Sequence, residues 1–413
     1  MRILFLTNFY PPHELGGYAQ WCQEVAVKLQ DKGHDVLVLT SRHMRDSSNT
    51  IIEKGIVRKL YLQAEIDYYQ PVDFFLKRSR QEKSNIDELA KCIENFKPDT
   101  IMVWGMWNLS SLVPHHAEKL LPGKVAYYIA SYWPIDTNLH TAYWQAPANR
   151  KITEFIKIPF RHAALAQILK EALSSELEHR YVYCCSEFVR DTLVAAGSIP
   201  SSAEVLLGGI DPTPFLIKQQ ENHKEISMTL KLVYFGRLIY DKGVHTAIEA
   251  LGNLRRKGIN HRIELTIIGG GHPEYMEYLK DLGRKLRVSD RIKYTDQVPR
   301  DQVPRLLKRF DAYLFTSIWP EPMARSVMEA MAAGLLVIGT EVGGQVEMLR
   351  NEQNALTFQA EDPLGLANQI ERAMNDSALR KQLALSGKEM VIEHFTIDRM
   401  VDEIEKKLLE ISS

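Results

Sequence analysis

The stretch RILFLTNFYPPHELGGYAQWCQEVAVKLQDKGHDVLVLTS, residues 2–41, decides the fold because it holds one complete strand–helix–strand unit. Its ends, residues 2–7 and 34–41, are compact apolar runs typical of β-strands. Between them Trp21, Val25 and Leu29 recur every four residues, and Gly33 supplies a stop signal, which predicts a helix. Two strands joined by a helix at this spacing form a βαβ unit, so the sequence predicts a parallel sheet.

The same alternation continues along the chain and then restarts. Strands are predicted at 99–105, 125–131 and 181–186, followed by a polar, proline-containing segment at 212–230 that we interpret as a linker. Further strands are predicted at 231–237, 263–271, 291–297, 312–317 and 335–340. A chain of 413 residues also exceeds what one core usually supports. We therefore predict an α/β fold with two doubly wound, Rossmann-like domains, 1–205 and 206–392, and a closing amphipathic helix within 393–413.

Composition excludes several classes of protein. The formal net charge of −1 lacks the basic excess expected of a nucleic-acid-binding protein. The four cysteines form no C-x-x-C pair and no metal-ligand spacing, which predicts buried free thiols in a reducing compartment. The sequence shows neither a signal-peptide pattern nor an apolar run near the ~18 residues of a membrane span. We expect a cytoplasmic protein, with contact at the inner face of the cell membrane as a further hypothesis.

Ligands of open α/β sheets bind beyond the carboxyl ends of the strands, and with two such domains the expected site is the cleft between them. One candidate segment there is WPEPMARSVMEAMAAG, residues 319–334. A helix is predicted to begin near Pro322, which places Glu321 at the helix mouth, where free N–H groups attract ligand oxygens. Glu329 lies about two turns further on, on the order of 10–12 Å away. That distance suits the two ends of one elongated ligand, although a salt bridge to a structural Lys or Arg is the alternative for Glu329.

Two further segments carry groups that suit a diphosphate. GRLIYDKG (236–243) offers the planar guanidinium of Arg237 and the point charge of Lys242, with a solvated loop as the alternative. In ELGGY (14–18), Gly16 and Gly17 allow the backbone to approach an anion closely. No Asp-x-Asp triplet occurs, so Arg237, Lys242 and helix dipoles, rather than a metal, are expected to neutralise a diphosphate. IIGGGH (267–272) is interpreted as a tight turn without chemistry.

Together these segments resemble a known enzyme family. GRLIYDKG, WPEPMARSVMEAMAAG and EVGGQVEML are similar to the C-terminal half of family 4 glycosyltransferases, which have the GT-B fold. The E-x7-E spacing from Glu321 to Glu329, with Arg237 and Lys242 upstream, is the specific part. ELGGYAQWCQEVAVKLQDKGHDV and VLLGGIDPTPF resemble the opening and the domain junction of the same family.

The resemblance implies a retaining hexosyltransferase that moves a sugar from a UDP- or GDP-sugar to a glycan or lipid-linked acceptor without an essential metal. It implies that residues 1–205 take the acceptor, that residues 206–392 bind the nucleotide sugar, and that the closing helix crosses back onto the first domain. Glu329 would bind the ribose, Arg237 and Lys242 the diphosphate, and Glu321 the sugar. The catalytic set would be Glu321, Arg237 and Lys242, and the remaining donor contacts Gly16, Gly17, Pro322, Met323 and Ala324.

The sequence departs from the family pattern at two places. In IASYWP, Ala130 and Ser131 stand where members often carry a His-Asp pair, and Ala324 stands where a glycine is common. Two alternatives therefore stay open: a catalytically degenerate homologue that binds a nucleotide sugar or a partner, and a nucleotide-sugar epimerase, for which no acid/base set can be placed. Tyr132, Trp133 and Asp136 are interpreted as lining the acceptor side.

One segment suggests a membrane contact. Residues 148–170 interleave basic side chains with apolar ones, and 74–83 (FFLKRSRQEK) does the same. Such segments in an acceptor domain contact anionic lipid headgroups. The alternative is an ordinary amphipathic core helix with solvated charges, which is favoured because Pro159 is expected to interrupt the pattern of the segment. The residues concerned are Arg150, Lys151, Phe155, Ile156, Lys157, Phe160 and Arg161.

Overall fold

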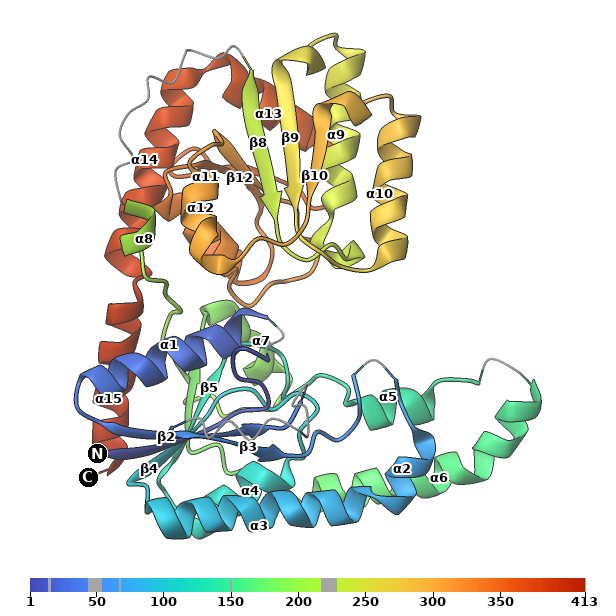
Figure 1. The fold of residues 1–413 in the computed structure, drawn as a ribbon, viewed down its shortest axis with the longest axis vertical. Helices are drawn as coiled ribbons and strands as arrows, with labels where there is room; N and C mark the ends of the chain where they lie inside the picture. The colour runs from blue at the N-terminus through green and yellow to red at the C-terminus, as the bar shows by residue number, and fades with distance from the viewer. Residues whose placement is uncertain (14–15, 44–53, 67, 149–150, 217–228, 413) are drawn as a thin grey trace. The chain divides into compact units, whose positions relative to one another are not determined.

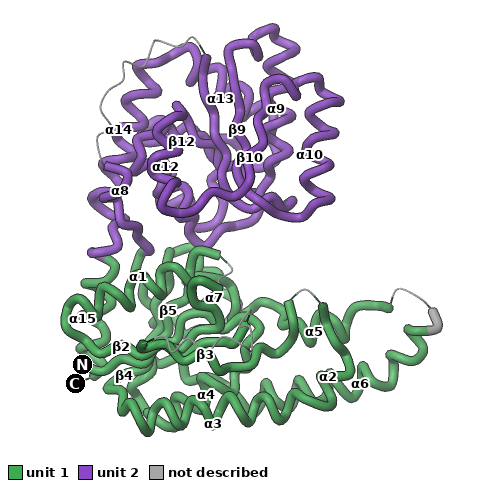
Figure 2. Tube along the Cα trace, viewed as in Figure 1, with its two compact units in different colours: residues 1–207, 400–413 green, residues 208–399 purple. Residues whose placement is uncertain are grey.

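The structure is a computed structural model that describes residues 1–13, 16–43, 54–66, 68–148, 151–216 and 229–412. Contacts divide the chain into two compact units (Figure 2). Unit 1 comprises Met1–Leu207 and Met400–Ser413, and unit 2 comprises Gly208–Arg399. Much of the predicted linker, and Arg150 of the predicted membrane segment, lie outside the described residues.

Unit 1 is built on a parallel sheet of seven strands in the order β3-β2-β1-β4-β5-β6-β7. β1 lies third in this order and pairs with both β2 and β4, so the strand order reverses there. Trp21, Val25 and Leu29 of the first helix are all buried, as their four-residue recurrence predicts. The strands are β1 (Arg2–Leu6), β2 (Asp35–Ser41), β3 (Ile56–Leu60), β4 (Thr100–Val103), β5 (Val125–Ile129), β6 (Tyr181–Cys184) and β7 (Glu204–Val205).

Helices cover both faces of this sheet: Figure 1 shows α1 on one face and α3 and α4 on the other. Three further helices, α2, α5 and α6, extend away from the sheet as an arm. α6 runs unbroken through Pro159, so the predicted interruption is wrong. Pro159 is exposed, and there solvent can satisfy the carbonyl that loses its partner. The helices are α1 (Gly17–Asp31), α2 (Pro71–Leu76), α3 (Arg78–Phe96), α4 (Leu112–Leu120), α5 (Leu139–Gln145), α6 (Lys151–Ser174) and α7 (Glu187–Ala195).

The closing helix α15 (Ile397–Ser412) packs against unit 1, as the resemblance implies. Lys32, just after α1, forms an ion pair with Asp402 at 2.6 Å, and Lys124 donates to the carbonyl of Ile411 at 2.8 Å. The two ends of the chain therefore lie side by side in Figure 1.

Unit 2 repeats the architecture with a parallel sheet of six strands in the order β10-β9-β8-β11-β12-β13. Its strands β11, β12 and β13 are buried throughout, as expected where helices cover both sides of a parallel sheet, whereas the edge strand β10 is partly exposed. The strands are β8 (Leu230–Phe235), β9 (Ile263–Ile268), β10 (Ile292–Thr295), β11 (Ala312–Phe315), β12 (Leu336–Thr340) and β13 (Leu356–Phe358). The helices are α8 (Thr213–Leu216), α9 (Val244–Arg256), α10 (Pro273–Lys285), α11 (Val303–Leu307), α12 (Arg325–Ala332), α13 (Pro363–Asn375) and α14 (Ser377–His394), with 3-10 turns at η1 (Tyr240–Lys242), η2 (Asn260–Arg262), η3 (Ser289–Arg291), η4 (Arg300–Gln302) and η5 (Gly343–Glu347).

The predicted α/β class with two parallel sheets is thus confirmed. The four cysteines are free and buried, also as predicted. Within the described ranges, each helix is too short or too polar to cross a lipid bilayer.

Candidate active site

The loops that follow β8 and β11 are joined by hydrogen bonds, because these strands are neighbours in the unit 2 sheet. The carbonyl of Asp241 accepts from the backbone N–H groups of Ile318 at 2.8 Å and Trp319 at 3.1 Å. The Thr316 hydroxyl donates to the carbonyl of Lys242 at 2.8 Å. The turn that carries Lys242 is therefore fixed against the segment that leads to Glu321.

Gly243 makes this close approach possible. It has φ 61°, in the left-handed region, and a Cβ at this position would overlap the carbonyl oxygen of Thr316. The glycine of GRLIYDKG therefore has a structural role: it ends the 3-10 turn η1, begins α9 and lets the two loops touch.

Lys242 and Glu321 form a direct ion pair. The hydroxyl of Ser317 donates to the same carboxylate oxygen at 3.0 Å. Both charged side chains are largely buried, with exposed fractions of 17% for Lys242 and 14% for Glu321. A short chain of polar groups, Lys242, Glu321 and Ser317, thus lies at the carboxyl ends of β8 and β11.

The loop after β12 supports Glu321 from behind. The N–H of Gly344 donates to the Glu321 carbonyl at 2.8 Å. Gly343 has φ 61°, and a Cβ there would overlap the backbone of Glu321. The glycines of EVGGQVEML therefore hold the Glu321 segment in place, and three consecutive strand ends build this site.

The electrostatics of Lys242 are unusual. Burial lowers the pKa of Lys242 to about 7, and the positive charge of Arg237 acts in the same direction. The charge of Asp241 raises the pKa, and contact with the Glu321 carboxylate favours the charged amine in the same way. Arg237 itself is exposed in the loop after β8. An anion placed beside Arg237 and Lys242 would meet two cations at once.

Glu329 lies on α12 with its carboxylate 3.1 Å from the guanidinium of Arg300, in the turn η4 after β10. The side chain of Glu329 is mostly buried, whereas that of Arg300 is half exposed. The sequence alternative of a salt bridge is therefore present, with a partner that solvent reaches. The sequence did not predict Arg300 as the partner of Glu329, because nothing in PRDQV indicates a contact with a helix on a more distant strand of the sheet.

The predicted start of the helix is wrong. α12 begins at Arg325, three residues later than Pro322, so Glu321 precedes the helix and does not sit at its mouth. Its carboxylate is held by Lys242 and Ser317, and its carbonyl by Gly344. Pro322 is half-buried in the turn, whereas Met323 and Ala324 are buried. The sequence gives no sign of Ser317 or Gly344 as partners, since both act through loop contacts.

The remaining predicted residues belong to unit 1. Gly16 has φ 89° and precedes α1, and Gly17 is the first residue of that helix. Ala130 and Ser131 follow β5 and are half-buried. Unit 2 therefore holds Arg237, Lys242 and Glu321 together with Pro322–Ala324, and Glu329 lies on the helix that follows. The two glycines belong to unit 1, far from this group in the sequence.

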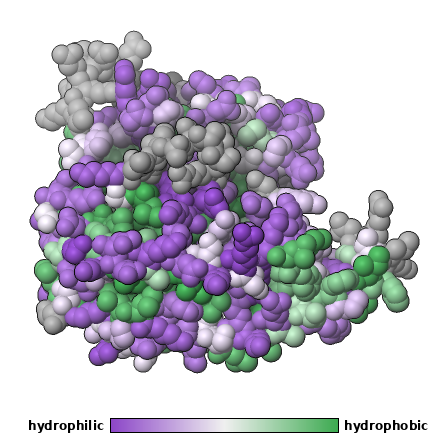
Figure 3. Space-filling view, turned by 60° about the horizontal axis from the view of Figure 1, so that its bottom comes forward, coloured by the Kyte–Doolittle hydropathy of each residue, from purple (hydrophilic) through white to green (hydrophobic). Residues whose placement is uncertain are grey.

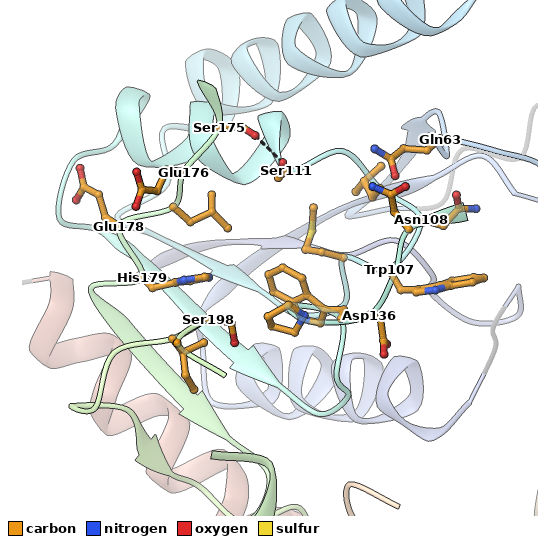
Figure 4. Close-up of a pocket in the computed structure, with 18 of the residues that line it drawn as sticks. Gln63, Trp107, Asn108, Ser111, Asp136, Ser175, Glu176, Glu178, His179 and Ser198 are labelled. Carbon is orange, nitrogen blue, oxygen red and sulfur yellow. Dashed lines mark hydrogen bonds between the residues drawn. The ribbon is translucent and has the colours of Figure 1, made fainter. Parts of the chain in front are cut away.

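Unit 1 contains a cavity of about 550 Å³ of its own. Trp133 and Asp136, two of the residues interpreted as acceptor-side, line it, whereas Tyr132 is buried beside it. Trp107, Asn108 and His179 also line the cavity, and a hydrogen bond of 2.7 Å joins Ser111 to Ser175 on its wall (Figure 4).

Two polar atoms of this cavity's lining are buried without a hydrogen-bond partner in the described structure. They are Nε1 of Trp133 and Nε2 of His179. Burial lowers the pKa of His179 to about 4, so its imidazole is neutral at pH 7. An indole N–H and a neutral imidazole nitrogen are groups that hydroxyl-bearing ligands satisfy. Over the described ranges, no three His, Cys, Asp or Glu side chains gather so as to hold a metal ion.

Two parallel α/β sheets and a carboxy-terminal helix that returns to the first unit define the GT-B fold, the class of two-sheet glycosyltransferases. Residues 217–390 match the family described as Glycosyl transferases group 1. The enzyme class predicted from the sequence is thereby confirmed.

Relatives and solved structures agree with this assignment. A glycogen synthase of Mycobacterium tuberculosis is 26% identical over 410 residues, 96% of this chain and 91% of the relative. Anabaena HepE in complex with UDP superposes with a TM-score of 0.70 at 19% identity, covering 99% of this chain and 100% of that one. Sucrose-phosphate synthase of Thermosynechococcus elongatus gives 0.73 at 18% identity, covering 99% and 98%. At these identities the two structures show the shared fold.

Proposed function

We propose that the enzyme transfers a hexose from a UDP- or GDP-sugar to a glycan or lipid-linked acceptor, with retention of configuration and without an essential metal. One observation carries the proposal: the largely buried pair of Lys242 and Glu321 at the carboxyl ends of β8 and β11, with Arg237 beside it. Strand ends of open α/β sheets are where such folds bind nucleotides. A cation with its pKa near neutrality is poised to bind a diphosphate, which restores its full charge.

Each acidic side chain has a proposed place on the donor. A diphosphate that binds Lys242 and Arg237 displaces the carboxylate of Glu321, which then accepts hydrogen bonds from the sugar hydroxyls. Glu329 exchanges Arg300 for the ribose hydroxyls, and the half-exposed guanidinium turns to solvent. Pro322, Met323 and Ala324 bring the backbone of the turn against the sugar.

The two cations also serve the reaction. Negative charge grows on the leaving diphosphate as the bond to the sugar breaks, and preorganised positive groups stabilise this charge more than that of the ground state. In a retaining transfer the departing diphosphate accepts the proton of the acceptor hydroxyl on the face it leaves. Lys242 and Arg237 then hold the product diphosphate.

Two similar proteins guide the choice of donor and acceptor to test first. Anabaena HepE has been solved with UDP and with UDP-glucose, which favours a uridine donor as the first to test. A Rhizobium meliloti lipopolysaccharide core glycosyltransferase, LpsE, is 29% identical over 40% of this chain, which favours a glycan or lipid-linked acceptor. We place the acceptor saccharide in the unit 1 cavity, where Trp133 offers an aromatic face and an N–H donor. Contact with the inner face of a cell membrane is part of the same proposal.

A donor screen tests the function. The enzyme is incubated with single UDP- and GDP-hexoses, and nucleoside diphosphate release and sugar products are measured by mass spectrometry. We expect release from one base class, slow without acceptor, and a loss of at least a hundredfold in Lys242→Met. Lys257→Met, which alters an exposed ion pair with Glu371 at 2.6 Å, is the matched control. Binding without release would indicate a degenerate homologue, and sugar conversion without release an epimerase.

A further inference from the structure

The arm of unit 1 has a small core of its own. Phe74 of α2, Trp144 of α5 and Ala164 of α6 form a buried cluster apart from the sheet. The amine of Lys157 lies 3.9 Å from the ring centroid of Tyr143 and donates to the Ala146 carbonyl at 2.9 Å. The inward face of α6 therefore packs against α2 and α5, and the buried amine of Lys157 is held by Tyr143 and Ala146.

The outward face of the described part of the same helix is mostly apolar. Exposed residues recur at alternating spacings of four and three, which places them on one stripe of the helix. Exposed fractions reach 80% for Phe155, 61% for Leu169 and 76% for Leu173. The solvent-facing side of a helix normally carries polar residues. On α6 that side carries apolar residues instead. The members of this stripe are Phe155, Pro159, His162, Ala166, Leu169 and Leu173.

The stripe continues onto α2. The rings of Phe75 and Phe160 lie 5.8 Å apart, which joins the two helices into one surface. Val72 and Leu76 on α2 are also exposed, as is Tyr68 just before it. Figure 3 shows hydrophobic side chains gathered over this arm at the right of the view. We call the exposed apolar residues of α2 and α6, with Tyr68, the arm surface.

The charges around the arm surface are one-sided. Every carboxylate of α2 and the described part of α6 has a basic partner: Asp73 with Lys77, Glu154 with Arg161, and Glu171 with Arg78. Lys170 is exposed on the outward side of α6, and the described residues offer it no ion-pair partner. Arg78 also pairs with Glu82 of α3, and Lys170 leaves a positive charge beside the apolar stripe, which complements an anionic surface.

We propose that the arm surface docks on an anionic lipid surface. α6 is too polar to span a bilayer, so it lies along the interface with its apolar stripe about 5–10 Å into the headgroup boundary and Lys170 among the lipid phosphates. The inference rests on the proposed function and deepens it, because docking would hold unit 1 at the membrane that contains a lipid-linked acceptor. Docking is independent of donor binding, and the two are measured separately.

Vesicle flotation of the full chain tests the inference. Phosphatidylcholine vesicles, with and without a third of phosphatidylglycerol, are compared at low and high salt. The test variant is the triple change Phe155→Ser, Leu169→Ser and Leu173→Ser, whose exposed positions spare the core. The control replaces two exposed leucines of unit 2, Leu364→Ser and Leu385→Ser. UDP binding is followed in all samples by calorimetry.

We expect the wild type and the control to float with anionic vesicles and the triple variant to bind them at least tenfold more weakly. Lys170→Glu should lose most of the preference for anionic over neutral vesicles, and all variants should keep wild-type UDP binding. Failure of the wild type to float would overturn the inference while leaving the proposed function intact. So would a dimer in light scattering that the triple variant converts to monomer, since the arm surface would then bind a second copy.

Discussion

Replacing Lys242 with methionine tests the core of the proposed site. The change keeps the length and apolar stem of the side chain and removes only the amine. In the proposed complex that amine donates a charge-assisted hydrogen bond to the diphosphate, worth about 1.5–3 kcal/mol. Its loss alone weakens UDP binding by roughly 10- to 150-fold.

A second effect acts in the same direction. Without Lys242, the carboxylate of Glu321 keeps the hydroxyl of Ser317 but loses its cation in a largely buried loop cluster. A buried, uncompensated negative charge then faces the incoming diphosphate, and in a partly desolvated site like charges repel more strongly than in water. Tenfold is therefore the lower bound of the expected loss.

The two effects can be separated by calorimetry with UDP at pH 7. Adding Glu321→Gln to Lys242→Met removes the repelling charge, so the double variant should bind UDP more tightly than Lys242→Met alone. Lys257→Met makes the same chemical change on a partly exposed lysine of the same unit and should leave binding unchanged. The reasoning is refuted if folded Lys242→Met, verified by thermal denaturation, binds UDP as the wild type does.

Three further outcomes are expected. Because the pKa of Lys242 lies near 7, raising the pH from about 6.5 to about 8.5 removes its proton. The wild-type Kd for UDP should therefore rise by up to about tenfold per pH unit above 7, whereas the Kd of Lys242→Arg should change little with pH. Glu329→Ala should weaken UDP binding about tenfold or more and leave inorganic pyrophosphate binding unchanged, since it loses only ribose contacts; equal losses for both ligands would contradict the ribose role. Gly243→Ala should destabilise the protein by about 2 kcal/mol more than Gly258→Ala, measured by denaturation, because both have positive φ but only the first meets a carbonyl; equal costs would contradict this.

Much of the fold follows from local patterns in the sequence. Trp21, Val25 and Leu29 are buried along α1 because a four-residue recurrence specifies one face of a helix whatever lies beyond it. The strands β4, β5, β11 and β12 are fully buried, as strands covered on both faces must be, and they lie where the sequence has apolar runs. From GRLIYDKG the sequence predicts two cations just after a strand. In the structure one of them, Lys242, pairs with Glu321, which lies 79 residues further along the chain.

The errors arise where contacts far away in the chain override a local preference. Pro322 suits a first helical position, but the backbone of Glu321 is held by Gly344, and the helix begins only at Arg325. Pro159 suits a break, but the inward face of α6 is anchored by Lys157 and the break does not occur. The contact of Arg300 with Glu329 depends on the position of β10 in the order of strands. No pattern within either segment encodes that order.

The two acidic side chains share one physical property: each is already paired with a cation, Glu321 with Lys242 and Glu329 with Arg300. A nucleotide sugar must therefore compete with both pairs, and part of its binding energy is consumed in separating them. An anion without hydroxyls gains Lys242 but leaves Glu321 without its cation, and a free sugar cannot displace the carboxylate from the amine. Only a ligand with a diphosphate flanked by hydroxyl-bearing groups satisfies Lys242, Glu321 and Glu329 at once, while the guanidinium of Arg300 turns to solvent. Selectivity for the whole donor over its fragments thus follows from the pairing itself, and fragment affinities should add up to less than the affinity of the intact nucleotide sugar.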